Sequence, residues 1–181
     1  MPQLIRRTYP AADAIATVCD ALGDDVAAST GLPRERILTL YNPVVSDEIA
    51  QRAREPVAHP WFSASLAQRA EGERRPEGLA PPVVLGVGRI ARQKDFDTLI
   101  RAFARVRARR LARLVILGEA KKPAKYAERI AELRALAGRL GVADDVDFPG
   151  FAQNPFAYMA RAAVFALSSR YEGFGNVLIE A

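Results

Sequence analysis

The stretch PPVVLGVGRIARQKDFDTLIRAFARV, residues 81–106, decides the fold. It begins with a short, valine-rich apolar run that is too short for a helix and predicts a buried strand. Beyond a loop that contains glycine and basic residues, apolar side chains recur at the spacing of a helix that buries one face. These apolar positions are Phe96, Leu99, Ile100, Phe103 and Val106.

The same order of strand and helix continues along the chain. Further strands are predicted at RLVILG (113–118), DDVDFPG (144–150) and AVFALSS (163–169). Helices are predicted at KYAERIAELRALAGRL (125–140), PFAYMARA (155–162) and the closing NVLIEA. Gly141 can end the longest of them in the left-handed conformation. Apolar strands that alternate with helices indicate an α/β fold with a Rossmann-like parallel sheet, whose ligands bind at the carboxyl ends of the strands.

The first 80 residues follow a different pattern. AIATVCDALGDDVAAST (14–30) predicts a strand that runs into a helix, and RILTL (36–40) predicts a second strand. A strand and a helix without partners of their own cannot make a domain, so we expect residues 1–41 to be the remnant of one domain and residues 42–181 to form another, incomplete at its carboxyl end. Residues 51–81 are predicted to be a loop-rich connection around Trp61 and Phe62.

Composition excludes several classes of protein. One thiol, Cys19, cannot form a disulfide framework or a zinc site, so a cytoplasmic location is expected. The net charge of +5 fits phosphorylated ligands or an anionic membrane surface. The sequence lacks the aromatic, zinc-binding and basic patterns of nucleic-acid-binding proteins, so no nucleic acid is expected as a partner. A peripheral contact with the inner face of the membrane stays open for the arginine-rich helix.

The loop GVGRIARQK, residues 86–94, combines the features of an anion site. Gly88 at a strand end lets a ligand approach the backbone, and Arg89 and Lys94 follow it, just before a helix begins. Guanidinium, ammonium and helix amino end together favour a phosphate. Asp95 and Asp97 resemble a metal-binding D-x-D pair, but at a helix start acidic residues cap free amides, so no metal is expected.

GVGRIA also fits the dinucleotide pattern G-x-G-x-x-[GA], with Ala91 in the third place and Glu119 as the acid that would bind a ribose. This pattern keeps an NAD(P)-dependent oxidoreductase open as an alternative. The helical spacing begins about four residues after Ala91, however, which removes the tight turn that seats a pyrophosphate. A module without catalytic activity that binds nucleotides or polyanions is the other alternative.

The closing stretch RYEGFGNVLIEA, residues 170–181, holds two carboxylates around a glycine-rich turn. The backbone amides of Gly173, Phe174, Gly175 and Asn176 can face one anion. Glu172 and Glu180 would repel phosphates, but a carboxylate accepts hydrogen bonds from sugar hydroxyls. The stretch therefore predicts a second wall of the same site.

Together these motifs resemble the retaining glycosyltransferases of glycosyl transferases group 1, also called family 4, which have the GT-B fold. The matching segments are VLGVGRIARQKDFDTLIRAF, RLVILGE, VDFPGFAQNPFAYMARA and LSSRYEGFGNVLIEA, with Asn42 and Pro43 at the entry to the second domain. The spacing of Glu172 and Glu180, joined to G-R-x₄-K, is the most specific part of the resemblance.

The resemblance implies a role for each residue. Arg89 and Lys94 would bind the diphosphate of a nucleotide sugar beside Gly88, and Glu172 would contact the donor sugar. Glu180 would accept hydrogen bonds from the ribose. The Gly173–Asn176 amides would support the sugar and the distal phosphate, and Gly150 and Phe151 would lie near the base.

The implied enzyme transfers a hexose from a nucleotide sugar, a UDP-sugar, to a lipid-linked or polysaccharide acceptor. It retains the anomeric configuration and needs neither cofactor nor metal. Because the acceptor-side domain is reduced to a strand and a helix, we expect the isolated chain to be inactive.

Overall fold

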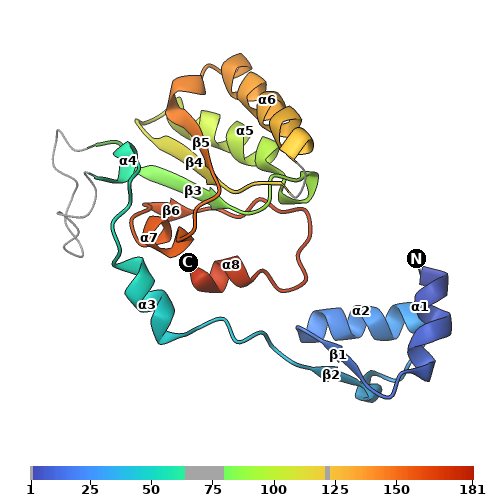
Figure 1. Cartoon of the computed structure of the whole chain (residues 1–181). Coiled ribbons are helices and arrows are strands. Elements are labelled where there is room, and N and C mark those ends of the chain that lie inside the picture. Colours follow the sequence, from blue (N-terminus) through green and yellow to red (C-terminus); the bar gives the residue numbers. More distant parts are fainter. Residues whose placement is uncertain (1, 64–79, 121–122) are drawn as a thin grey trace. The chain divides into compact units, whose positions relative to one another are not determined.

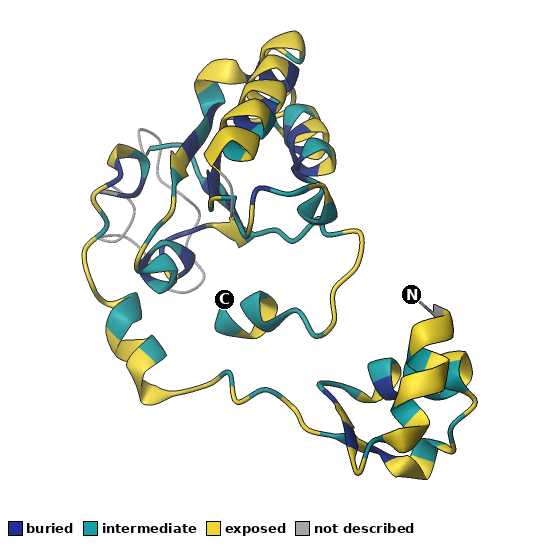
Figure 2. Ribbon diagram, turned by 45° about the vertical axis from the view of Figure 1, so that its right-hand side comes forward, coloured by how far each residue is buried: buried dark blue, intermediate teal, exposed yellow. Residues whose placement is uncertain are grey.

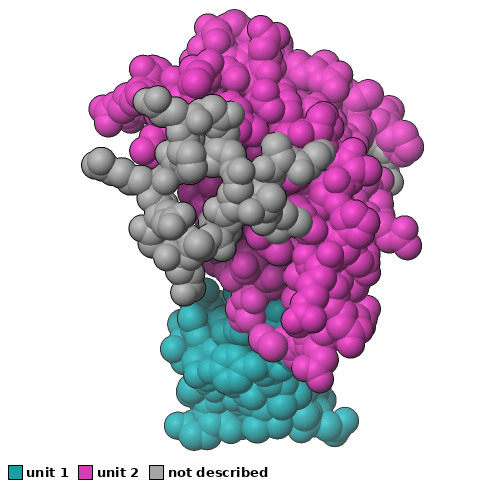
Figure 3. Space-filling view, turned by 90° about the vertical axis from the view of Figure 1, so that its left-hand side faces the viewer, with its two compact units in different colours: residues 1–44, 172–176 teal, residues 45–171, 177–181 magenta. Residues whose placement is uncertain are grey.

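The computed structural model describes residues 2–63, 80–120 and 123–181 of the chain. It divides into two compact units, which are coloured separately in Figure 3. The first unit comprises residues 1–44 and 172–176, and the second comprises residues 45–171 and 177–181. We describe each unit by itself.

A parallel sheet of four strands forms the centre of the second unit (Figure 1). Its order across the sheet is β5-β4-β3-β6. The strands are β3 (Val83–Val87), β4 (Arg113–Leu117), β5 (Val146–Gly150) and β6 (Val164–Phe165). The four predicted strands are therefore present, although β6 is shorter than its apolar run suggested.

Helices cover both faces of this sheet, which explains why its two inner strands, β3 and β4, are almost wholly apolar. On one face lie α5 (Phe96–Arg107) and α6 (Pro123–Arg139), and Figure 2 shows their inward sides as buried. Leu114, Ile116, Ile100 and Leu133 are fully buried in this cluster. Val106 departs from the prediction, since it is 40% exposed at the end of α5.

The opposite face is covered by α4 (Pro60–Ser63) and α7 (Pro155–Met159). Phe62, Leu85, Val115 and Met159 are buried there, and Val177 of α8 (Asn176–Glu180) packs against them. His59, just before α4, is buried in this layer, where its Nε2 lies 2.9 Å from Oδ2 of Asp147. Because His59 Nδ1 accepts from the backbone of Trp61, Nε2 carries the proton and donates to Asp147.

The first unit is smaller and holds a parallel pair of strands, β1 (Ile15–Thr17) and β2 (Ile37–Thr39), joined through α2 (Asp20–Thr30). This matches the predicted strand, helix and strand. The structure adds helices that the spacing of apolar residues did not reveal, namely α1 (Pro2–Thr8) and, in the second unit, α3 (Asp47–Ala53). Part of the predicted loop-rich connection, residues 64–79, lies outside the described residues.

Short 3₁₀ segments complete the described elements: η1 (Tyr9–Ala11), η2 (Arg34–Arg36), η4 (Arg92–Lys94) and η5 (Ala143–Asp145). Gly141 follows α6 with φ of 69°, the left-handed helix end that the sequence predicts. Within the described residues, no helix is both long enough and apolar enough to cross a membrane.

Candidate functional site

The order of the strands places a topological switch point beside β3. From β3 the chain adds β4 and β5 on one side, and it then returns to add β6 on the other side. The loops that follow β3 and β6 therefore leave the sheet at the same edge. Open α/β sheets bind their ligands outside the carboxyl ends of the strands, at such a switch point. The predicted cation loop follows β3, and the stretch that leads to Glu172 follows β6.

Three glycines join the ends of neighbouring strands at this edge. Gly88 N–H donates to the carbonyl of Leu117 at 2.9 Å, and Gly118 N–H donates to the carbonyl of Gly150 at 2.8 Å. A Cβ atom on Gly118 would overlap the carbonyl oxygen of Gly88, so the two backbones can approach this closely only with glycine there. Gly88 and Gly150, both predicted site residues, are thus brought to one edge.

Arg89 and Lys94 stand at the two ends of the loop after β3. Arg89 is exposed, and its Nη2 donates to Oε1 of Gln93 at 3.4 Å. Lys94 ends the short 3₁₀ turn η4, and its aliphatic stem lies against Gly88, where an added Cβ would meet Lys94 Cε at 2.9 Å. The loop therefore presents an exposed guanidinium at one end, and at its other end the Lys94 stem lies over Gly88.

A pocket of about 520 Å³ opens between the loop after β3 and α6. Its charged lining residues are Arg89, Arg92, Lys125, Glu128, Arg129 and Glu132. Of the predicted cation pair only Arg89 lines it, because the Lys94 stem lies over Gly88. The pocket therefore shares Arg89 with the predicted phosphate site but does not include Lys94.

The loops after β3 and β6 are joined by direct contacts. The backbone N–H of Arg170 donates to the carbonyl of Gln93 at 2.9 Å, and Ser168 Oγ donates to the carbonyl of Lys94 at 2.8 Å. Gln93 Nε2 returns a hydrogen bond to the carbonyl of Tyr171 at 3.0 Å. We call these contacts the β3–β6 bridge.

An ion pair extends the β3–β6 bridge at the start of α5. Arg170 Nε lies 3.2 Å from Oδ2 of Asp95. Partial burial raises the pKa of Asp95, but hydrogen bonds from Arg170 and Thr98 outweigh it, so the pKa is below its ordinary value. Asp97, in the first turn of α5, pairs instead with Arg129 of α6. Asp95 thus contacts the loop after β6, and Asp97 contacts α6. The prediction that both acids cap the helix did not include these ion pairs.

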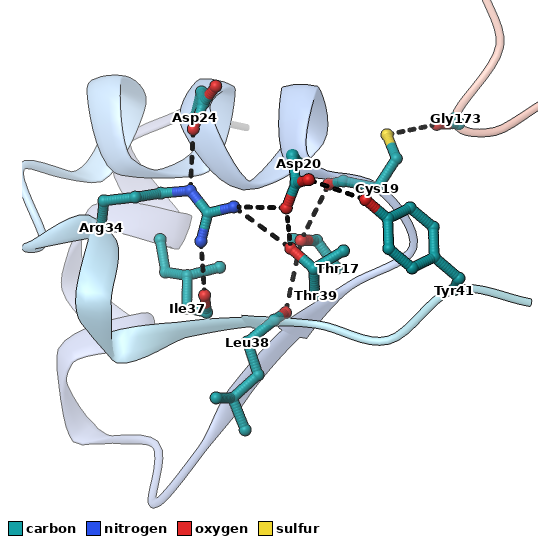
Figure 4. A network of polar contacts seen from close by, with 10 residues as sticks. All are labelled: Thr17, Cys19, Asp20, Asp24, Arg34, Ile37, Leu38, Thr39, Tyr41 and Gly173. Carbon is teal, nitrogen blue, oxygen red and sulfur yellow. Dashed lines mark hydrogen bonds and ion pairs between the residues drawn. The ribbon is translucent and has the colours of Figure 1, made fainter.

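The glycine-rich turn of the acidic stretch belongs to the first unit. Cys19 Sγ donates to the carbonyl of Gly173 at 3.1 Å (Figure 4), and Asn42 Nδ2 donates to Oδ1 of Asn176 at 3.0 Å. The rings of Phe174 and Tyr41 lie 5.9 Å apart. Glu172 is exposed at the start of the turn, and Gly175 has φ of 73°.

Tyr41 is itself held by a polar network at the start of α2 (Figure 4). Its hydroxyl donates to Oδ2 of Asp20 at 2.7 Å, while Thr39 and Arg34 donate to Oδ1 of the same carboxylate. The hydrogen bond to Asp20, burial and the Asp20 charge raise the pKa of Tyr41. Tyr41, whose ring lies near Phe174 of the turn, is therefore itself held in place by Asp20.

The remaining predicted residues lie in the second unit. Phe151 follows β5 and is 68% exposed, and Glu180 is the half-buried last residue of α8. The structure thus gathers Gly88, Arg89, Lys94 and Gly150 at one sheet edge, and it holds Gly173–Asn176 in the other unit. Among the residues described, no three His, Cys, Asp or Glu side chains gather in a way that could hold a metal ion.

Sequence reasoning missed Gln93, Ser168 and Arg170, which form the β3–β6 bridge. Gln93 occupies an unspecified position of G-R-x₄-K, so the pattern gives it no role. Since two of the bridge's hydrogen bonds end on backbone carbonyls of residues 93 and 94, only the return of β6 beside β3 could have revealed them.

Comparison with known proteins agrees with this geometry. A family model described as glycosyl transferases group 1 matches residues 81–181, which include the sheet and its strand-end loops. The chain belongs to this family. The glycosyltransferase relationship that the sequence suggested is therefore confirmed.

One curated glycosyltransferase relative aligns with nearly the whole chain. It is the N-acetylgalactosamine-N,N'-diacetylbacillosaminyl-diphospho-undecaprenol 4-alpha-N-acetylgalactosaminyltransferase of Campylobacter jejuni, which is 33% identical over 178 residues. The match covers 98% of this chain and 41% of the relative. The chain thus spans about two-fifths of the length of this glycosyltransferase.

Solved structures show the same fold. A complex of Anabaena HepE with UDP-glucose has a TM-score of 0.66 at 21% identity, and it covers 94% of this chain and 42% of that one. WaaG, a glycosyltransferase involved in lipopolysaccharide biosynthesis, has a TM-score of 0.60 at 21% identity, with 92% and 40% covered. The expected α/β fold, a parallel sheet with helices of the GT-B kind, is therefore confirmed.

Proposed function

We propose that this chain is the donor-binding part of a retaining hexosyltransferase that uses a UDP-sugar and needs no metal or cofactor. In this proposal residues 42–181 bind the donor and residues 1–41 are the remnant of the acceptor-side domain. The observation that carries the proposal is the position of Arg89 and Lys94 at the switch point beside β3. Two cations at that edge suit a diphosphate, and the complex of HepE with UDP-glucose supports the choice of nucleotide sugar.

The chemistry follows from the charge that develops as the donor reacts. The bond between the anomeric carbon and the diphosphate oxygen breaks, and its electron pair stays on the diphosphate. Arg89 and Lys94 stabilise that growing negative charge. The acceptor hydroxyl attacks from the same face, so the configuration is retained, and its proton passes to the departing phosphate oxygen.

The carboxylates serve the neutral parts of the donor. Glu180 accepts from the ribose hydroxyls, and Glu172 contacts the donor sugar, since a carboxylate can accept two hydroxyl donors. The Gly173–Asn176 amides support the sugar and the distal phosphate, while Gly150 and Phe151 lie near the base. These roles remain proposals of the family pattern, to be tested residue by residue.

The acceptor is proposed to be lipid-linked or polysaccharide sugar. The diphospho-undecaprenol named for the relative from Campylobacter jejuni and the lipopolysaccharide pathway named for WaaG support this class. A cytoplasmic location with peripheral contact at the inner face of the membrane follows from the same acceptor. The 181-residue chain is expected to bind donor without turnover.

Calorimetric titration of the chain with UDP tests the proposal. UDP should bind, and Arg89→Ala should weaken it about 10–150-fold, since a hydrogen bond to a charged group contributes about 1.5–3 kcal/mol. Arg101→Ala is the matched control, because Arg101 is exposed on α5 and carries the same charge. Equal losses in both variants would indicate a general polyanion site. Binding of NAD without binding of UDP would favour the oxidoreductase.

A further inference from the structure

Gln93 connects the two loops that leave the sheet at the switch point. Its side-chain Oε1 accepts from Arg89 Nη2 at 3.4 Å, and its Nε2 donates to the carbonyl of Tyr171 at 3.0 Å. Its backbone carbonyl accepts from the N–H of Arg170 at 2.9 Å. One residue therefore touches the loop after β3 and the loop after β6 at once.

The chemistry of these partners makes glutamine specific at this position. A guanidinium can only donate, and a backbone carbonyl can only accept, so the partners fix which end of the Gln93 amide is oxygen. A glutamate could not donate to Tyr171, and a lysine could not accept from Arg89. The amide is the side chain that satisfies both partners without adding charge beside Arg89 and Lys94.

We propose that Gln93 is a positioning residue that sets the Arg89 guanidinium for the donor diphosphate and ties that loop to Tyr171, the residue before Glu172. The inference rests on the proposed function, since it takes Arg89 as a phosphate ligand. It assigns a role to an unspecified position of the G-R-x₄-K pattern.

The rest of the β3–β6 bridge gives the amide a fixed frame. Ser168 Oγ holds the carbonyl of Lys94 at 2.8 Å, and Arg170 holds both the carbonyl of Gln93 and the carboxylate of Asp95. With the backbone of residues 93–95 held in this way, the Gln93 side chain is the part of the β3–β6 bridge that reaches Arg89. A ligand that moves Arg89 therefore acts on the backbone at Tyr171 through this amide.

A double-mutant cycle on UDP binding tests the proposal. Gln93→Met keeps the length of the side chain and removes its donor and acceptor. We expect it to weaken UDP about 2–10-fold, the scale of a neutral hydrogen bond. In the Arg89→Ala background the same change should cost less than about 2-fold, because residues that act through each other are not additive. NMR titration with millimolar UDP measures the affinity of the variants that bind UDP weakly.

The control variant is Gln51→Met, which changes the same residue type on the exposed side of α3. It should leave UDP affinity unchanged, and all variants should keep the chemical-shift dispersion of the folded chain. Equal UDP affinity of Gln93→Met and wild type would overturn the inference, as would an equal loss with and without Arg89. If the wild-type chain binds no UDP, the proposed function fails and the role of Gln93 fails with it.

Discussion

The two sheets of this chain are stabilised in different ways. The four-stranded sheet of the second unit is covered by helices on both faces, and its central strand β4 is buried from Leu114 to Leu117. The two-stranded sheet of the first unit buries Ile15 and Ile37, and a network around Asp20 and Arg34 supports the start of its helix. The spacing of apolar residues in the sequence predicts which side chains are buried, but it does not predict a network of polar contacts.

The largest effect is expected when an apolar side chain is removed from each unit. Ile100 is fully buried between α5 and the sheet, so Ile100→Ala should lower the free energy of unfolding by about 2–5 kcal/mol. Leu38 of β2 is 55% exposed, and Leu38→Ala should change it by less than about 0.5 kcal/mol. Urea denaturation followed by circular dichroism measures both, and similar losses would contradict the contrast.

Glycine can affect stability by allowing two backbones to pack closely or by making the chain flexible. A pair of substitutions in the second unit tests these two effects separately. Gly118→Ala should lower stability by about 1–3 kcal/mol, because its Cβ meets the carbonyl of Gly88. It should also weaken UDP binding by displacing the loop after β3. Gly138→Ala has open space in the last turn of α6 and should raise stability by about 0.4–1 kcal/mol. Equal effects in urea denaturation would remove the steric explanation.

Sequence predicted the parts of the fold that apolar spacing controls. Residues 81–106 predicted both β3 and α5, and Gly141 predicted the end of α6. Val106 was misplaced because a helix that buries four side chains can end with its next apolar residue in solvent. Gln93 and the hydrogen bond between Asn42 and Asn176 were missed, since they join residues whose proximity depends on the fold rather than on local pattern.

The polar network of the first unit predicts a difference between arginine and other residues at position 34. The Arg34 guanidinium donates to Asp24, Asp20 and the carbonyl of Ile37 and packs on Gly23. A lysine cannot reproduce that planar set of donors, so Arg34→Lys should lower the melting temperature, though by less than Ile100→Ala. Arg36→Lys is the control, because the Arg36 guanidinium makes a weaker contact, a hydrogen bond of 3.5 Å from Nη2 to the carbonyl of Ala12. Differential scanning calorimetry compares them.

Acidic pH should weaken the same network. Hydrogen bonds from Thr39 and Tyr41, with help from Arg34 against partial burial, lower the pKa of Asp20 below 3.8. Since the folded pKa is the lower one, the contribution of this carboxylate is present above the unfolded value and is lost as pH falls through the folded value. The melting-temperature difference between wild type and Asp20→Asn should therefore shrink as the pH falls from about 5 through the ordinary pKa of Asp20 and below it. A difference that stays constant over that range would remove the carboxylate charge from the explanation.

The smallest effect is expected at Asp95, where a polar contact holds the well-packed unit. Asp95 has φ of 45°, the one positive value at a non-glycine position in the described residues. Arg170 is 64% exposed, so Asp95→Asn should lower stability by only about 0.2–1 kcal/mol. Asp95→Gly loses the same ion pair but relieves a left-handed backbone that costs about 1–2 kcal/mol, so it should be at least as stable as wild type. If Asp95→Asn unfolds at the same urea concentration as wild type yet binds UDP more weakly, the ion pair positions the loop rather than stabilising the unit. A glycine variant less stable than Asp95→Asn would contradict the cost assigned to the left-handed backbone, because both variants lose the ion pair.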